Sequence, residues 1–265
     1  MFPLKDNIPT ERTPVVTIAL IIINCVVYLF LQPKSGIDFS GNSLNQSDLT
    51  NYAAIPYEFT HWGKHCEFVA DVQNVVCEGQ SGVQGQAGSQ LPTIATVFTS
   101  MFSHGGLLHL GGNMLFLWIF GNNVEDSMGP VKYVLFYLLG GIAALVLQTV
   151  IDPNAAVPTL GASGAIAAVL GGYILLYPRA RVLTVIFIVF FFTLIEIPAI
   201  LVLGFWFLQQ IFFGAAGLSD PTGGGGGVAY FAHIGGFAFG LLAIKVFATR
   251  LNPHYQGGGP RYPVY

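Results

Sequence analysis

Four polar side chains in apolar surroundings are the residues of this sequence that could do chemistry. His109 and Asn113 occur in HLGGN, Ser163 in GASGA and His233 in AHIGG. A serine hydroxyl becomes a nucleophile when a base such as histidine accepts its proton, and a nearby N–H donor can stabilise the oxyanion that follows. Each residue alone has a plainer explanation, because Ser163 can be a small packing residue and the other three can cross-link helices.

The composition is that of a membrane protein. Of the 265 residues, 53% are hydrophobic and 9% are charged, whereas a soluble domain carries about a quarter charged residues. The net charge of −3, without a basic cluster, gives no sign of nucleic-acid binding. The three cysteines lack zinc-ligand spacing, and no metal or cofactor is expected. A disulfide between Cys66 and Cys77 is left open.

Six segments are apolar enough to be membrane spans of about 20 residues. They cover residues 15–31, 105–120, 131–151, 159–177, 194–213 and 228–247. The apolar run over 182–213 is too long for one upright helix and too short for two. The basic residues before this run and those after the last span lie on the same side only if the run contributes one span. Residues 182–192 are then expected to form an interfacial or buried segment.

The distribution of Lys and Arg predicts the orientation. With the N-terminus inside, eight of the ten basic residues are cytoplasmic and only Lys34 and Lys64 are external. The predicted fold class is therefore an all-α polytopic membrane protein with a long external first loop. We expect a cytoplasmic segment over 1–14, a six-span domain over 15–250 with its external loop over 32–104, and a flexible cytoplasmic tail over 251–265.

Three segments near the external side have expected roles. Apolar residues at helical spacing between positions 91 and 102 predict a helix lying on the outer surface. The glycine-rich segment over 217–230 is suited to a mobile lid above His233, because successive glycines have little intrinsic structure. The aromatic residues at 205–207 are interpreted either as one side of a substrate gate or as ordinary lipid-facing surface.

The four candidate residues converge on one depth. Spans two, four and six run from outside to inside, so Asn113, Ser163 and His233 each fall roughly 5–12 Å along their helices. His109 shares the helix face of Asn113, four residues away. Small residues are expected to bring the helices together at the site: Gly161, Gly164, Gly236 and Gly240. This convergence favours one functional site over separate packing roles, although depth alone leaves a transport site open.

The same residues lie in motifs that resemble those of the rhomboid intramembrane serine proteases, bacterial members in particular. The matching stretches are SHGGLLHLGGNMLFLWIFGNNVEDSMG (103–129), GASGAIAAVLGGY (161–173) and AHIGGFAFG (232–240). The resemblance implies a six-transmembrane-helix rhomboid-like bundle and a serine endopeptidase that hydrolyses peptide bonds in or near transmembrane segments of other membrane proteins. It further implies a dyad of Ser163 as nucleophile and His233 as general base, with Asn113 and His109 stabilising the oxyanion.

One departure and two alternatives accompany this hypothesis. Ala167 stands where some bacterial members carry an aromatic residue under the histidine ring, so what orients His233 is left open. The alternative function is a non-catalytic rhomboid-like binder of membrane helices, and a transporter is disfavoured because no internal repeat is evident. The expected partners are transmembrane protein substrates and the lipid bilayer, with no nucleic acid and no metal. The expected location is a bacterial plasma membrane, with multiple spans and both termini cytoplasmic.

Overall fold

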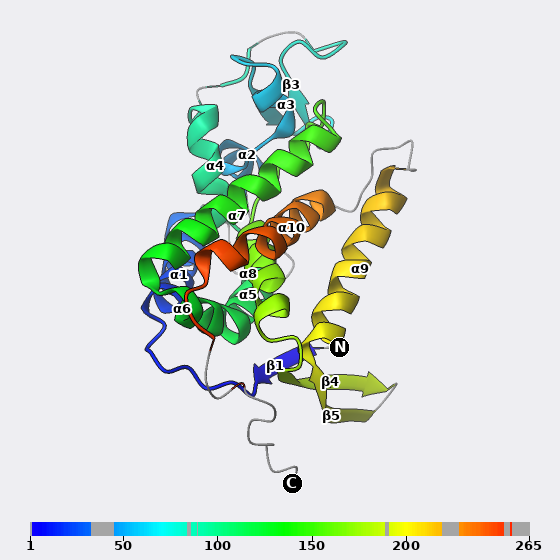
Figure 1. Ribbon diagram of the computed structural model, residues 1–265. Coiled ribbons are helices and arrows are strands. Elements are labelled where there is room, and N and C mark those ends of the chain that lie inside the picture. Colours follow the sequence, from blue (N-terminus) through cyan, green and yellow to red (C-terminus); the bar gives the residue numbers. More distant parts are fainter. Residues whose placement is uncertain are drawn as a thin grey trace.

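The structure is a computed structural model that describes residues 2–32, 45–83, 86–88, 90–188, 191–218, 228–251 and 255. Helices dominate it (Figure 1). They are α1 (Val15–Val26) with the π-helical turn η1 (Val27–Leu31), α2 (Gln46–Tyr52), α3 (Pro56–Thr60), α4 (Thr93–Phe102), α5 (Leu107–Phe116) with the π-helical turn η2 (Leu117–Gly121), α6 (Asn122–Met128), α7 (Pro130–Ile151), α8 (Ser163–Leu176), α9 (Ala199–Leu218) and α10 (Tyr230–Phe247).

The helices give the chain the character of a membrane protein. Among the described residues, α7, α9 and α10 are long and apolar enough to cross a membrane. Shorter apolar helices cover Val15–Leu31, Thr93–Phe102 and Ser163–Leu176. The number of six spans stays a prediction, because only three of the described helices meet the requirements of both length and hydropathy. The helix expected on residues 91–102 is present as α4.

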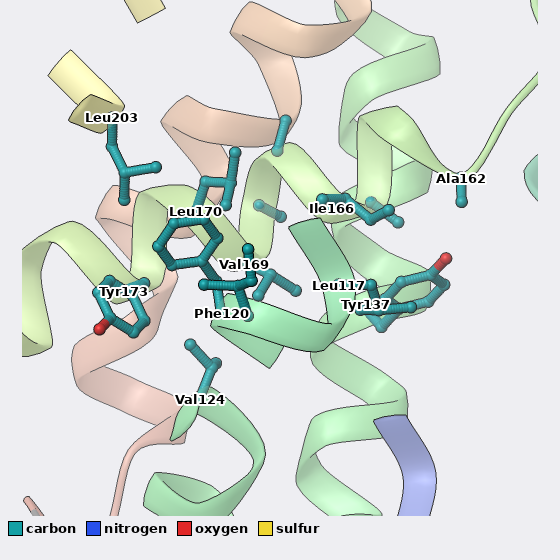
Figure 2. Close-up of a cluster of buried hydrophobic side chains, with 14 of the residues drawn as sticks. Leu117, Phe120, Val124, Tyr137, Ala162, Ile166, Val169, Leu170, Tyr173 and Leu203 are labelled. Atoms are coloured by element: carbon teal, nitrogen blue, oxygen red, sulfur yellow. The ribbon is translucent and has the colours of Figure 1, made fainter. Parts of the chain in front are cut away.

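Helix α8 lies at the centre of the fold, packed by α7, by α10 and by the α5–α6 segment (Figure 1). Its residues 164–173 are all buried. Figure 2 shows Ile166, Val169 and Leu170 of α8 in the same apolar cluster as Phe120 of η2. A helix that is covered on all sides needs no polar face, which is why this segment is apolar around its whole circumference.

Helices α8 and α10 meet backbone to backbone. A Cβ atom added to Gly236 would lie 2.0 Å from the carbonyl oxygen of Gly164, and one added to Gly240 would lie 2.0 Å from that of Ala168. From α8 toward α10, a Cβ added to Gly171 would lie 2.2 Å from the carbonyl oxygen of Phe237. Real Cβ atoms do not approach oxygen so closely, so the contact requires glycine at each of these positions.

A three-stranded sheet departs from the prediction of an all-α fold. Strands β4 (Arg181–Ile188) and β5 (Phe191–Pro198) pair antiparallel, and β1 (Phe2–Asp6) pairs antiparallel with β4, in the order β1-β4-β5. The long apolar run therefore divides into a hairpin and α9, which begins at Ala199 rather than at residue 194. Hydropathy does not separate a buried strand from a buried helix, and the β-branched and aromatic residues of the hairpin favour strands.

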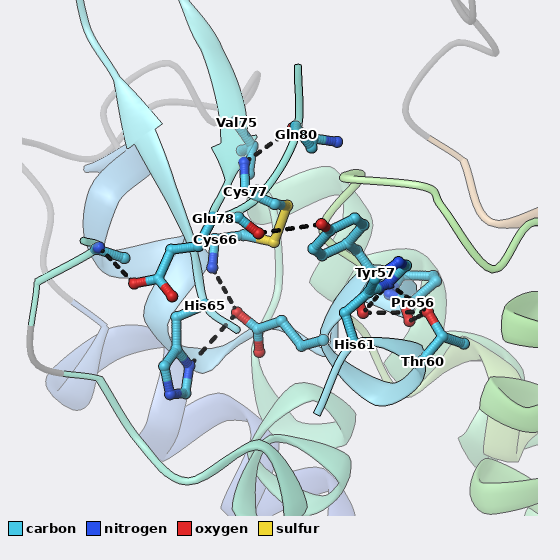
Figure 3. The surroundings of a disulfide bond; sticks show 12 residues. Pro56, Tyr57, Thr60, His61, His65, Cys66, Val75, Cys77, Glu78 and Gln80 are labelled. Atoms are coloured by element: carbon cyan, nitrogen blue, oxygen red, sulfur yellow. Dashed lines mark hydrogen bonds and ion pairs between the residues drawn. A yellow bond between two sulfur atoms is a disulfide. The ribbon is translucent and has the colours of Figure 1, made fainter. Parts of the chain in front are cut away.

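A second sheet lies within the predicted external loop. Strands β2 (Cys66–Val69) and β3 (Asn74–Cys77) pair antiparallel, with Cys66 opposite Cys77. These two cysteines form a disulfide (Figure 3), which the sequence had left open. Both are fully buried and pack with Ile55 and Tyr57 in a small core of their own.

Asp6 ties the N-terminal strand to the helices. Its Oδ2 accepts hydrogen bonds from Asn123 Nδ2 at 2.8 Å and from the Tyr173 hydroxyl at 2.6 Å. Tyr173 belongs to α8, so this bond anchors the end of α8 that is opposite to Ser163. Burial raises the pKa of the Asp6 carboxyl to about 7, because a charged carboxylate is disfavoured away from water.

We expect Gly240→Ala to destabilise the protein by roughly 1–3 kcal/mol, because the added methyl group forces α10 away from α8. Thermal unfolding of the detergent-solubilised protein measures the loss. Gly204→Ala in α9 is the matched control, since a Cβ there meets nothing within 4 Å and alanine favours a helix. Equal melting temperatures for wild type and Gly240→Ala would contradict the close contact.

We expect Asp6→Asn to remove a pH dependence from the stability. Between the unfolded value of 3.8 and the folded value of about 7, the folded state holds a proton that the unfolded state has released. The contribution of Asp6 to the stability of the wild type is therefore full below about pH 4 and is lost as the pH rises toward 7. Relative to Asp6→Asn, this loss is on the order of 4 kcal/mol. Parallel stability curves for the two proteins over this range would show that Asp6 does not titrate in this way.

Candidate active site

Ser163 and His233 face each other across the contact between α8 and α10. Ser163 is the first residue of α8, and His233 lies in the first turn of α10. His233 Nε2 lies 2.8 Å from Ser163 Oγ, a normal hydrogen-bond length. The contact of Gly236 with the Gly164 carbonyl lies directly beside this pair in both helices. The backbone contact therefore sets the distance between hydroxyl and imidazole.

The second ring nitrogen of His233 also has a partner. Nδ1 lies 2.7 Å from Oε1 of Gln210, a buried residue of α9. The Trp206 ring, one turn earlier on α9, lies 5.7 Å from the imidazole, centroid to centroid. Sequence reasoning did not single out Gln210. The available signal was a polar side chain within an apolar helix, which by default marks a functional candidate.

His109 lines the same cavity as Ser163 and His233. The backbone N–H of Gly105 points at His109 Nδ1, 3.4 Å away, so in the neutral ring the proton is on Nε2. A Cβ added to Gly161 would lie 2.9 Å from His109 Nε2 and 3.6 Å from Ser163 Oγ. His109 Nε2 and the serine hydroxyl therefore both border the space beside Gly161, at the same cavity.

Asn113 differs from the other three candidate residues, because it does not line the cavity at Ser163. It lies one turn after His109 on α5 and is buried. Its Nδ2 atom has no hydrogen-bond partner among the described residues, and its side chain does not line the cavity at Ser163. The structure thus brings Ser163, His233 and His109 to one cavity, and Asn113 is not among the residues that line it.

The cavity at these residues has a volume of about 520 Å³. This is within the range of ordinary ligand pockets. Its walls come from α2, α4, α7, the start of α5, the segment before α8 with the first turn of α8, and the start of α10. Polar side chains of Gln46, Thr50, Ser100 and Thr159 are among the lining residues, so the cavity is suited to hold water next to the serine.

The segment that precedes α8 is held by hydrogen bonds. The Gly161 N–H donates to the Ser100 carbonyl at 2.8 Å, which joins it to α4. Ala54 and Thr159 exchange two backbone hydrogen bonds, of 3.0 and 2.8 Å. Gly161 itself has a φ of +118°, a conformation that favours glycine. This glycine makes room for the ring of His109 on α5, and its role in helix packing stays a prediction.

Ala167 belongs to the contact between the two central helices. It is fully buried, and a Cβ on Gly236 would lie 3.2 Å from the Cβ of Ala167. A large ring at position 167 would therefore collide with α10 in its present position. The orientation of His233 does not depend on an aromatic residue here.

Two other expected features have different outcomes. Most of the predicted lid, residues 219–227, lies outside the described residues. Of the aromatic residues at 205–207, Phe207 stacks on Phe237 of α10 with a centroid distance of 4.2 Å, whereas Phe205 is exposed. Of these aromatic residues of α9, one therefore packs against α10 and another is at the surface of the protein. Among the described residues, no group of three or more His, Cys, Asp or Glu side chains is placed to hold a metal ion.

Several curated proteins are similar to this chain. Rhomboid protein 1, mitochondrial, of Saccharomyces cerevisiae is 33% identical over 153 residues, which cover 56% of this chain and 40% of that protein. RHOMBOID-like protein 4 of Arabidopsis thaliana is 32% identical over 172 residues, covering 61% of this chain and 38% of that protein. The human Presenilin-associated rhomboid-like protein, mitochondrial, is 32% identical over 96 residues, covering 36% of this chain and 25% of that protein.

The chain thus spans about 40% or less of the length of these relatives. Their organisms are eukaryotic and two of the names say mitochondrial, so the expectation of a bacterial-type protein in a plasma membrane finds no support in them. The family model of the Rhomboid domain matches residues 92–250. That range includes Ser163, His233 and His109, and it covers more than half of the sequence. The chain belongs to the rhomboid family.

Proposed function

We propose that this protein is an intramembrane serine endopeptidase that hydrolyses peptide bonds in or near transmembrane segments of other membrane proteins. The observation that carries the proposal is the distance of 2.8 Å between His233 Nε2 and Ser163 Oγ, at the wall of a cavity large enough for a peptide segment and water. Family membership and the apolar helices support the membrane setting.

The reaction follows from the positions of the two side chains. His233 Nε2 accepts the proton of Ser163 Oγ as that oxygen attacks the carbonyl carbon of the substrate. The imidazolium then gives the proton to the leaving amine, which breaks the peptide bond and leaves an acyl group on Ser163. Water from the cavity, activated in turn by His233, releases the acyl group and restores the free serine.

The negative charge of the tetrahedral intermediate needs hydrogen-bond donors. The Nε2–H group of His109 is at the same cavity as Ser163, and the first N–H groups of α8, which a helix leaves without intrahelical partners, are at its Ser163 end. Asn113 Nδ2 is a buried donor that has no partner within the described part of the chain. An unpaired buried donor is costly to keep, which supports a role for Asn113 in stabilising the intermediate.

The membrane arrangement is part of the same proposal. The six-span domain over residues 15–250 has both termini on one side, according to the distribution of Lys and Arg. Ser163 and His233 then lie near the opposite surface, because both begin their helices. Water therefore has a short way to the site, and substrates are cut near the end of their membrane helix.

We expect Ser163→Ala to abolish cleavage of a transmembrane substrate, and His233→Ala to lower it by on the order of 10⁴-fold or more. Covalent labelling by a fluorophosphonate probe should require both residues. Ser100→Ala is the matched control, because Ser100 lines the same cavity and its hydroxyl donates to the Val97 carbonyl. Cleavage by purified, folded Ser163→Ala protein would refute the enzyme. Absence of labelling and cleavage in the wild type would favour the non-catalytic binder of membrane helices.

We expect Asn113→Ala to lower kcat by roughly 10²–10³-fold with little change in KM, because an oxyanion donor acts in the transition state and not on bound substrate. Cleavage kinetics in detergent or liposomes measure this. Asn122→Ala, the same change at a half-buried position of α6, should keep its activity. An Asn113→Ala protein with unchanged kcat would remove Asn113 from the oxyanion site and leave that role to His109.

A further inference from the structure

Among the described residues, the imidazole of His233 has two hydrogen-bond partners, and neither of them is a carboxylate. Nε2 lies 2.8 Å from Ser163 Oγ, and Nδ1 lies 2.7 Å from Gln210 Oε1. An imidazole that acts as a base has to present an unprotonated Nε2 to the serine. The proton of the neutral ring must therefore be on Nδ1, and some group has to make that tautomer the stable one.

The orientation of the Gln210 amide is fixed by its own helix. Gln210 Nε2 donates to the Trp206 carbonyl at 3.3 Å. If the amide were turned around, its oxygen would face that carbonyl oxygen, and two acceptors would meet without a proton between them. The amide oxygen is therefore the atom that faces His233.

This orientation determines the tautomer. An amide oxygen can only accept, so His233 Nδ1 has to donate and carries the proton. Nε2 is then left with its lone pair, 2.8 Å from the serine oxygen. The Ser163 hydroxyl is consequently the donor in that second bond, as nucleophilic attack requires.

We propose that Gln210 is a positioning residue that holds His233 in the Nδ1–H tautomer and aims its Nε2 at Ser163. The inference rests on the proposed function for its effect on catalysis. It also accounts for a dyad in which position 167 carries no aromatic residue, because the ring is oriented by a hydrogen bond from its far side.

A glutamine suits this role in an apolar environment. The Nδ1–H group donates to the amide oxygen both before and after Nε2 takes up the serine proton, so the ring keeps its direction through the reaction. A neutral amide does this without burying a permanent charge, which would be costly in this setting.

The acceptor comes from a helix other than those of the dyad. Gln210 is on α9, which also contacts α10 through Trp206 beside His233 and through Phe207 on Phe237. The aim of His233 therefore depends on α9 remaining in place against α10. A movement of α9 away from α10 would release Nδ1 and leave the tautomer unspecified.

The test compares three variants of the protein. Gln210→Leu removes the acceptor, and we expect kcat to fall about 10-fold or more with KM changed less than about 2-fold. Gln210→Glu keeps an acceptor oxygen at the same reach, and we expect it to retain clearly more activity than Gln210→Leu. Gln209→Leu is the matched control, since the same change lies about 100° around the helix axis and should have little effect.

A spectroscopic measurement separates this inference from the proposed function. In protein with ¹⁵N-labelled histidine, the nitrogen signals of His233, assigned by their loss in His233→Ala, report which ring nitrogen carries the proton. We expect the proton on Nδ1 in the wild type and a mixture of both tautomers in Gln210→Leu. This measurement requires no catalytic activity.

The outcomes are distinct. A proton on Nε2 in the wild type, the same tautomer in Gln210→Leu, or an equal loss of activity in Gln209→Leu would overturn the role of Gln210. If the wild type cleaves nothing while the tautomer depends on Gln210 as expected, the proposed function fails and the positioning of His233 by Gln210 stands.

Discussion

The contact between the backbones of α8 and α10 is the constraint on which the rest of the structure depends. Glycines at 171, 236 and 240 let the two helices touch where any side chain would intrude. The first residues of both helices are consequently brought together, and a hydroxyl meets an imidazole at 2.8 Å. Both groups are attached to rigid helices, so their separation is set by packing and not by a loop.

The polar groups around this contact form a row that crosses three helices. Ser163 of α8 bonds to His233 of α10, and His233 bonds to Gln210 of α9. Polar groups away from water are costly unless they are hydrogen-bonded. Each of the two bonds therefore pairs a donor with an acceptor that the surrounding apolar residues could not supply. Because the Gln210 oxygen can only accept, the donors along the row point from Ser163 to His233 and from His233 to Gln210.

Both ends of α8 are held by segments outside the helical bundle. Near Ser163, the Gly161 N–H is bonded to α4 and Thr159 is paired with Ala54. At the opposite end, Tyr173 donates to Asp6 of the N-terminal strand. That strand belongs to the sheet that ends where α9 begins. The strand, the sheet and α9 thus connect the support of α8 with the helix that carries Gln210.

The sequence by itself was sufficient to predict a helical membrane protein of the rhomboid family, the helix over 91–102, and the approach of the helices that carry Ser163 and His233. These features rest on local patterns, namely apolar length, small residues at helical spacing and short motifs. The sheet of β1, β4 and β5 was missed, because apolar strands and apolar helices have the same hydropathy and the pairing partner lies far away in the chain.

Only the tertiary structure decided how the site is completed. The bond from His233 to Gln210 joins residues of two helices, and no pattern within either helix specifies which faces meet. The same holds for Gly161, where only the packed structure shows that the glycine makes room for His109. The stretch GASGA at residues 161–165 therefore identified, from the sequence, the hydroxyl that could react. The side from which Gln210 holds the His233 ring depends on contacts between segments that are distant in the sequence. Those contacts exist only once the helices have packed.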